Sequence, residues 1–162
     1  MSAARLLIAI ISLVAIATGA WVSFRLVSPS PVPQTATVLP QSVELPDFSL
    51  VDQNGAAFTR DGFRGHWSVV FFGFTHCPDV CPLTLQVLAG ARRQLADTGQ
   101  APLPRIVLVS VDPERDTPAV IGEYVRHFGA DIVGVTGELG ELRKLTDGLG
   151  IFFQRAAGED GA

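Results

Sequence analysis

Residues 68–82 read SVVFFGFTHCPDVCP, an apolar run followed directly by two closely spaced cysteines. The first seven residues are β-branched, aromatic or small, which is typical of a strand buried on both faces. From Leu83 to Thr98 apolar residues recur at helical spacing. Cys77 and Cys81 are therefore predicted to lie in the turn between a buried strand and the helix that follows it.

The rest of the domain repeats this alternation of strands and helices. We expect further strands at Ile106 to Val111, Ile132 to Thr136 and Ile151 to Phe153, and helices from Asp116-Thr117-Pro118 to about Phe128 and from Glu138 to Asp147. Asn54-Gly55 predicts a hairpin between residues 48–51 and 57–59. Strand–helix–strand order predicts an α/β domain with a parallel sheet and right-handed crossovers.

The N-terminal part of the chain differs in composition from the domain. From Leu6 to Phe24 there are 19 consecutive residues without a charge. A helix of that length spans about 28 Å, close to the roughly 30 Å hydrocarbon core of a bilayer. Residues 1–27 are thus predicted to be a transmembrane anchor, with a cleaved signal peptide as the alternative. Residues 28–42 hold four prolines and no charge and are predicted to be a linker to the domain, residues 43–162.

Charge and cysteine content exclude some classes of function. The formal net charge is −4, and no block of Lys or Arg exists that could neutralise a phosphate backbone, so we expect no nucleic-acid partner. The two cysteines are too few for a disulfide-stapled mini-domain. Because they lie close together, we expect them to act as a unit.

The spacing of Cys77 and Cys81 suits two kinds of chemistry. If the helix extends back through Cys77, the two Cα atoms lie about 6.2 Å apart, inside the roughly 4.4–6.8 Å range of disulfides. The start of a helix also stabilises a thiolate. The pair could close as a disulfide or bind a soft cation such as Cu(I). A purely structural disulfide would stabilise little because its loop is so short, and redox pairs are more often spaced C-x-x-C.

Residues 71–82, FFGFTHCPDVCP, and 109–117, VSVDPERDT, closely resemble the Sco (SenC) family, as does VGVTG at 133–137. The resemblance covers about residues 43–155. It implies a thioredoxin-like fold on a single N-terminal transmembrane helix. It also implies a copper metallochaperone for the binuclear copper site of cytochrome c oxidase subunit II. The alternative is a membrane-anchored thiol–disulfide oxidoreductase that reduces the cysteines of that site. A peroxidatic thiol enzyme is disfavoured because both cysteines lie in one turn.

The resemblance also implies roles for particular residues. Cys77 and Cys81 match the family's copper-binding cysteines, and would be the redox-active pair in an oxidoreductase. Asp112 matches a family position near the site, where we expect a partner-docking or site-tuning role. An ordinary turn residue is the alternative for Asp112.

One family feature has no counterpart in this sequence. The family's third copper ligand is a histidine in a Val-Asp-His segment, which would lie beyond Ala162. The C-terminal strands are therefore expected to be missing, which would leave Ser68–Phe74 as an unpaired edge. None of the histidines His66, His76 and His127 matches that ligand, so Cu(I) is favoured and Cu(II) should bind weakly.

The N-terminal segment also predicts a location. Arg5 and the free N-terminal amine favour an N-terminus inside the cytoplasm. No Arg- and Ser-rich transit peptide precedes the apolar stretch, which favours a bacterial origin. We therefore expect a single-pass protein of the bacterial inner membrane whose domain faces the periplasm.

Overall fold

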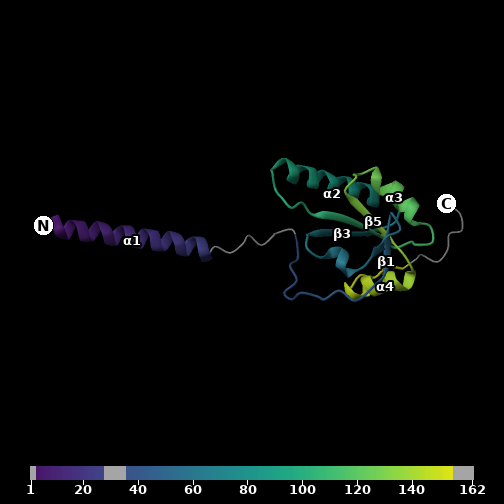
Figure 1. Ribbon diagram of the computed structural model, residues 1–162, viewed down its shortest axis with the longest axis horizontal. Helices are drawn as coiled ribbons and strands as arrows, with labels where there is room; N and C mark the ends of the chain where they lie inside the picture. Colours follow the sequence, from purple (N-terminus) through teal and green to yellow (C-terminus); the bar gives the residue numbers. More distant parts are fainter. Residues whose placement is uncertain (1–2, 28–35, 155–162) are drawn as a thin grey trace. The chain divides into compact units, whose positions relative to one another are not determined.

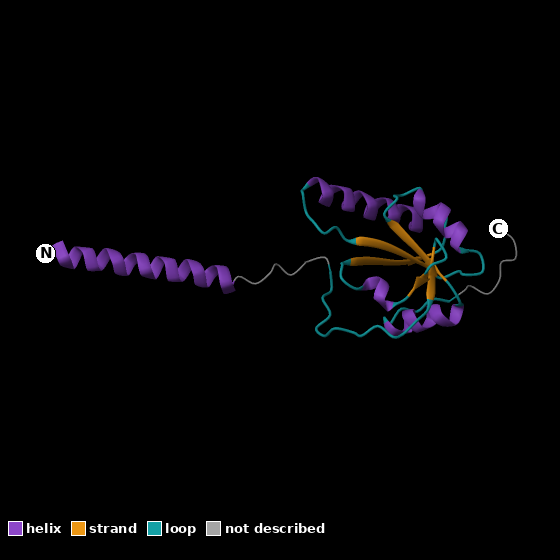
Figure 2. Cartoon of the chain, viewed as in Figure 1, coloured by secondary structure: helices purple, strands orange, loops and turns teal. Residues whose placement is uncertain are grey.

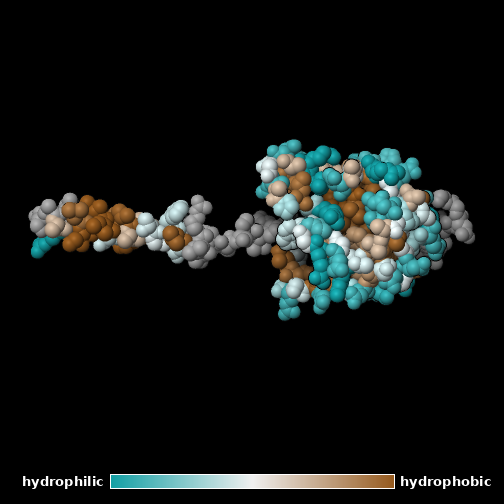
Figure 3. Space-filling model, in the orientation of Figure 1, coloured by the Kyte–Doolittle hydropathy of each residue, from teal (hydrophilic) through white to brown (hydrophobic). Residues whose placement is uncertain are grey.

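The computed structural model describes residues 3–27 and 36–154. These residues belong to two compact units, one within Met1–Ser42 and one within Val43–Ala162. In the first unit, α1 runs over Ala3–Val27, and apolar surface covers much of it (Figure 3). Within the described ranges, none of the helices combines the length and hydropathy that crossing a bilayer requires, so the predicted transmembrane anchor over residues 1–27 is not borne out.

The second unit is built on a five-stranded sheet with strand order β2-β1-β5-β4-β3. Its elements are β1 (Leu50–Asp52), β2 (Ala57–Phe58), a 3-10 helix η1 (Arg60–Phe63), β3 (Ser68–Gly73), α2 (Val80–Asp97), β4 (Arg105–Ser110), α3 (Pro118–Arg126), β5 (Ile132–Thr136) and α4 (Leu139–Gly148). Strands β3, β4 and β5 are parallel, whereas β1 is antiparallel to both β5 and β2. The predicted α/β class and the N-terminal hairpin are confirmed.

Helices cover both faces of this sheet. Figures 1 and 2 show α2 and α3 on one face and α4 with η1 on the other. Strand β4 lies between β3 and β5. Because side chains alternate along a strand, β4 contributes side chains to the hydrophobic clusters on both faces of the sheet. Ile106 and Leu108 join the cluster under α2 and α3, and Val107 and Val109 join the cluster under α4.

Local sequence explains where the helices begin. Thr117 caps α3 by accepting a hydrogen bond from the Val120 N–H at 3.4 Å, and Pro118 occupies the first turn, where its missing N–H costs nothing. Helix α2 begins at Val80, three residues earlier than the apolar pattern predicted. Pro82 fits there because the first-turn N–H groups have no partner inside the helix.

Two expectations about strands are wrong. Ile151–Phe153 forms no strand within the described residues. The β3 segment is not buried on both faces, since most of its residues are only partly buried and Val69 is 36% exposed. The reason is that β3 lies at the edge of the sheet and, among the described strands, pairs with β4 alone. Among the described strands, the side of β3 that faces away from β4 has no partner, as the sequence predicted.

Candidate metal centre at the cysteine pair

The cysteines lie where the carboxyl ends of β3 and β4 meet. These two strands are parallel and in register from Ser68 opposite Arg105 to Gly73 opposite Ser110. Just beyond that point the Val111 N–H donates to the Gly73 carbonyl at 2.9 Å. The loop that carries Cys77 therefore lies beside the loop that follows β4, at the edge where open α/β sheets place their sites.

Cys77 precedes α2, and Cys81 is its second residue. The helix does not extend back through Cys77, so the 6.2 Å spacing expected for a helical pair does not apply. Cys77 instead curls toward the helix start, where its Sγ accepts a hydrogen bond from the Cys81 N–H at 3.4 Å. The N-cap residue Asp79 provides no side-chain bond, so the Cys77 sulfur takes up one of the first-turn N–H groups.

The two sulfurs have different surroundings, although both cysteines are free thiols. Cys81 is 4% exposed, whereas Cys77 is only partly buried. A hydrogen bond from the Cys81 thiol, aided by main-chain N–H groups of the turn, lowers the pKa of Cys77. Burial, followed by the interaction with Cys77, raises the pKa of Cys81 to about 11. The site thus pairs an accessible sulfur that ionises readily with a buried one that stays protonated.

Gly73, the last residue of β3, leaves room for the buried sulfur. A Cβ added at Gly73 would lie 3.0 Å from the Cys81 Sγ and 3.0 Å from the Phe71 ring. Any larger residue would have to displace one of them. Packing of the Cys81 sulfur therefore explains why a glycine precedes the cysteine loop.

A buried carboxylate joins the two loops. Asp116 is fully buried, and its Oδ2 accepts hydrogen bonds from the Thr75 N–H at 2.9 Å and the Ser110 hydroxyl at 2.6 Å. Its Oδ1 accepts from the Thr75 hydroxyl at 2.5 Å. The sequence pattern predicted Asp116 only as part of the entry to α3, because its partner Thr75 lies 41 positions away in the chain.

Asp112 lies in the same loop and is 6% exposed. Its carboxylate accepts a hydrogen bond from the Arg115 guanidinium, and its main-chain carbonyl accepts from the Asp116 N–H at 3.0 Å. A cavity of about 530 Å³ adjoins this loop, lined by Phe74, Val111, Asp112, Pro113, Glu114, Arg115, Leu139, Arg143, Phe153 and Gln154. The docking role predicted for Asp112 stays a prediction.

His76 and His127 are exposed. His76 is half exposed, with its Nδ1 3.1 Å from the Thr75 Oγ1 and 3.8 Å from the Asp116 Oδ1. His127 caps the end of α3, where its Nδ1 lies 2.8 Å from the Glu123 carbonyl. Within the described part of the chain, no group of three or more His, Cys, Asp or Glu residues is arranged to hold a metal ion. A third ligand for the cysteine pair is thus not found there.

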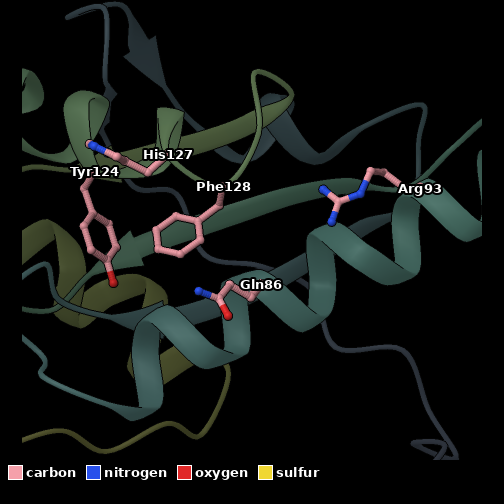
Figure 4. Close-up of a pocket in the computed structure, with 5 residues that line it drawn as sticks. All are labelled: Gln86, Arg93, Tyr124, His127 and Phe128. Atoms are coloured by element: carbon pink, nitrogen blue, oxygen red, sulfur yellow. The ribbon is translucent and has the colours of Figure 1, made fainter.

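A second pocket opens between α2 and the end of α3 (Figure 4). Tyr124 and Phe128 pack edge to face at 5.2 Å, and Gln86 faces them from α2. The Tyr124 hydroxyl is buried and finds no hydrogen-bond partner among the described residues. Burial, and then the charges of Cys81, Cys77 and Asp116, raise the pKa of Tyr124 to about 12. The phenol is therefore within electrostatic range of the cysteine pair, a relation that nothing in the sequence indicated.

The sheet topology and the cysteine turn define a thioredoxin-like α/β protein with a C-x-x-x-C pair at the start of its second helix. The family model SCO1/SenC matches residues 37–162. The chain is 40% identical over 114 residues to an SCO2-like protein of Rickettsia felis, which covers 70% of this chain and 55% of that protein. It is 37% identical over 124 residues to a putative copper-binding protein of Stutzerimonas stutzeri, covering 76% and 60%.

Solved structures agree with the sequence comparison. The copper-bound structure of ScoI from Arabidopsis thaliana superposes with a TM-score of 0.66 at 34% identity, covering 70% of each chain. The chain belongs to the SCO1/SenC family. It spans a little more than half of the length of the Rickettsia felis and Stutzerimonas stutzeri relatives.

Proposed function

We propose that this chain binds Cu(I) through Cys77 and Cys81 and delivers it to the binuclear copper site of cytochrome c oxidase subunit II. Copper is then the cargo of the protein. The observation that carries the proposal is the pair of free sulfurs at the start of α2, with the Cys77 Sγ 3.4 Å from the Cys81 N–H. The copper-binding name of the Stutzerimonas stutzeri relative and the copper-bound Arabidopsis thaliana structure support it.

The donor set fits Cu(I) better than Cu(II). Thiolates are soft ligands that suit Cu(I), whereas Cu(II) prefers imidazole and a fuller, tetragonal shell. Two sulfurs can hold Cu(I), and the described residues offer no third group for a larger shell. We therefore expect tight Cu(I) binding, with release of thiol protons, and weak Cu(II) binding. Stable, stoichiometric Cu(II) binding with a thiolate charge-transfer band would contradict this part of the proposal.

Copper binding is tested on the reduced full chain in competition with a Cu(I) chelator of known affinity. The wild type is compared with Cys77→Ser and Cys81→Ser. We expect either variant to lose tight binding, because a single remaining thiolate cannot enclose the ion. Transfer is then followed by mixing the copper-loaded chain with a reduced, copper-free soluble domain of subunit II. Wild-type binding that survives either substitution would overturn the proposal.

One observation favours a second function, the reduction of disulfides in the same copper site. An accessible Cys77 of lowered pKa beside a buried Cys81 is the arrangement that thiol–disulfide exchange uses. The Cys77 thiolate would attack a disulfide of subunit II, forming a mixed disulfide and releasing one thiolate. Cys81 would then lose its proton, attack the Cys77 sulfur and release the second thiolate. An external dithiol must reduce the pair again.

The two functions differ in which variants fail. An oxidoreductase turns over disulfide substrate without copper and accumulates a mixed disulfide in Cys81→Ser, whereas a chaperone needs copper loading and both sulfurs. Reduction assays of the oxidised subunit II domain, run with and without Cu(I), separate them. No mixed disulfide in Cys81→Ser would exclude the reductase.

The location of the protein is also a proposal. We propose that the unit formed by residues 43–162 works on the periplasmic side of a bacterial inner membrane. The support is the uncharged stretch from Leu6 to Phe24, which predicts export either as an anchor or as a signal peptide. Protease treatment of spheroplasts checks it. The protease reaches only the outer face of the inner membrane, so a periplasmic domain is digested and a cytoplasmic one is protected.

A further inference from the structure

We infer that Asp116 is the positioning residue of the cysteine pair: through Thr75 it fixes the loop that carries Cys77 relative to Cys81 in α2. The inference rests on the proposed function, because it concerns how the two sulfurs are held for Cu(I) or for a disulfide. It assigns the role to a residue that touches neither sulfur through any hydrogen bond in the structure.

The contacts of Asp116 support this assignment. Both carboxylate oxygens are occupied: Oδ2 by the Thr75 N–H and the Ser110 hydroxyl, and Oδ1 by the Thr75 hydroxyl. Thr75 is thus held twice, through its main chain and its side chain, by one fully buried group. Hydrogen bonds to a carboxylate are stronger than bonds between neutral groups, so these bonds attach the loop firmly to the rest of the fold.

The other end of the link is equally fixed. Ser110 is the last residue of β4 and fully buried, and its hydroxyl also accepts from the Asp112 N–H at 3.1 Å. The Asp116 N–H donates to the Asp112 carbonyl at 3.0 Å. The Asp116 carboxylate therefore holds Thr75 at a fixed position relative to β4. Only one residue separates Thr75 from Cys77.

Cys81 is positioned mainly by burial and packing, with one main-chain hydrogen bond from Phe74 where the loop begins. Its side chain is buried beneath α2 and packed against the end of β3 at Gly73. Cys77, in contrast, lies outside the helix in the short loop that Asp116 holds. Removing Asp116 should release one sulfur and leave the other in place, which widens the range of distances between them. Residues that support metal ligands in this way typically change metal affinity by about 10–100-fold when removed.

The test compares Cu(I) affinity in Asp116→Ala with two matched variants of the full chain. Asp79→Ala makes the same substitution between the two cysteines, where the carboxylate is exposed and makes no capping bond. Leu142→Ala destabilises the fold from the opposite face of the sheet. We expect a loss of about 10–100-fold in Asp116→Ala and affinities close to wild type in the two controls. An equal loss in Leu142→Ala would show a purely structural effect and overturn the inference.

Thr75 provides a second test that keeps the buried carboxylate. Thr75→Val removes the hydroxyl at nearly constant shape and should weaken Cu(I) binding, whereas Thr75→Ser keeps the hydroxyl and should bind as wild type. Because Asp116 acts through Thr75, the double variant with Asp116→Ala should bind no more weakly than Asp116→Ala alone. Additive losses in the double variant would overturn the inference.

A readout without copper completes the experiment. In a fixed glutathione buffer, a sulfur pair that is held together forms its disulfide more readily. We expect the oxidised fraction of Cys77–Cys81 to fall in Asp116→Ala and Thr75→Val, and to stay at the wild-type level in Asp79→Ala. A wild-type chain that binds no Cu(I) defeats the proposed function. Tight wild-type binding and an unchanged oxidised fraction in Asp116→Ala defeat the inference alone.

Discussion

Cys77 and Cys81 occupy one turn, yet their sulfurs should react at different rates. The thiolate is the reactive form of a cysteine, and the bond from Cys81 that lowers the pKa of Cys77 favours it there. Burial keeps Cys81 protonated and out of reach. We expect iodoacetamide at pH 8 to modify Cys77 well before Cys81, as measured by peptide mass spectrometry. Equal rates at the two positions would contradict this asymmetry.

Tyr124 makes the fold sensitive to alkaline pH. Its pKa rises from 10.0 to about 12 on folding, so the folded state binds the phenolic proton more tightly than the unfolded chain. This contribution to stability is fully present below pH 10 and is lost as the pH rises through about 12. We expect Tyr124→Phe to reduce the loss of stability over that window, as followed by urea unfolding at several pH values.

The same substitution should also change stability at neutral pH. The buried Tyr124 hydroxyl has no partner among the described residues, and burying an unsatisfied polar group costs about 1–3 kcal/mol. We expect Tyr124→Phe to raise the free energy of unfolding by about 1 kcal/mol. A lower value would mean that the hydroxyl has a partner, such as an ordered water, in solution.

At the scale of the elements, apolar runs and turn residues predicted most of the fold. The β4 and β5 runs, the Asn54-Gly55 hairpin and the Thr117-Pro118 helix entry all appear at or near the expected residues. Local patterns sufficed because each of these elements is specified by neighbouring residues. The strand predicted at Ile151–Phe153 is wrong. A strand needs a partner strand, and three apolar residues do not reveal whether one is available.

Strand β3 is the element most exposed to unwanted pairing. It is uncharged, contains no proline and lies at the sheet edge, and such edges promote association between chains. We expect Val69→Lys to slow aggregation, measured by light scattering at a temperature below unfolding. Val120→Lys on α3 is the matched control, because Val120 is 38% exposed and Val69 is 36% exposed. A similar effect of both substitutions would point to net charge rather than to the edge.

At the scale of the whole domain, β4 couples the two sides of the core. Leu85 lies in the cluster under α2 and α3, and Leu142 lies in the cluster under α4. Both are fully buried, so Leu85→Ala and Leu142→Ala should each lower the free energy of unfolding by about 2–5 kcal/mol. Because β4 is packed on both faces, we expect one cooperative transition in each variant. Separate transitions by circular dichroism and fluorescence would show that the faces unfold independently.

The candidate site was only partly predictable at this scale. The cysteine pair is visible in the sequence because its two residues are near neighbours, and the strand-to-helix turn follows from the surrounding pattern. The contacts of Asp116 and Tyr124 were not visible, because parallel pairing of β3 with β4 and packing of α3 beside α2 bring distant residues together. The spacing of residues along the sequence does not predict such long-range contacts.

The hydrogen bonds between Thr75 and Asp116 join residues 41 positions apart, whereas the two sulfurs are only four residues apart. If the two cysteines bind copper as proposed, a denatured chain still carries both ligands close together and can retain the ion, although it loses the attachment to β4. A ligand that binds folded and denatured chains alike raises the melting temperature only through the difference between its two affinities. Copper should consequently protect this domain against heat far less than the proposed tight binding alone suggests.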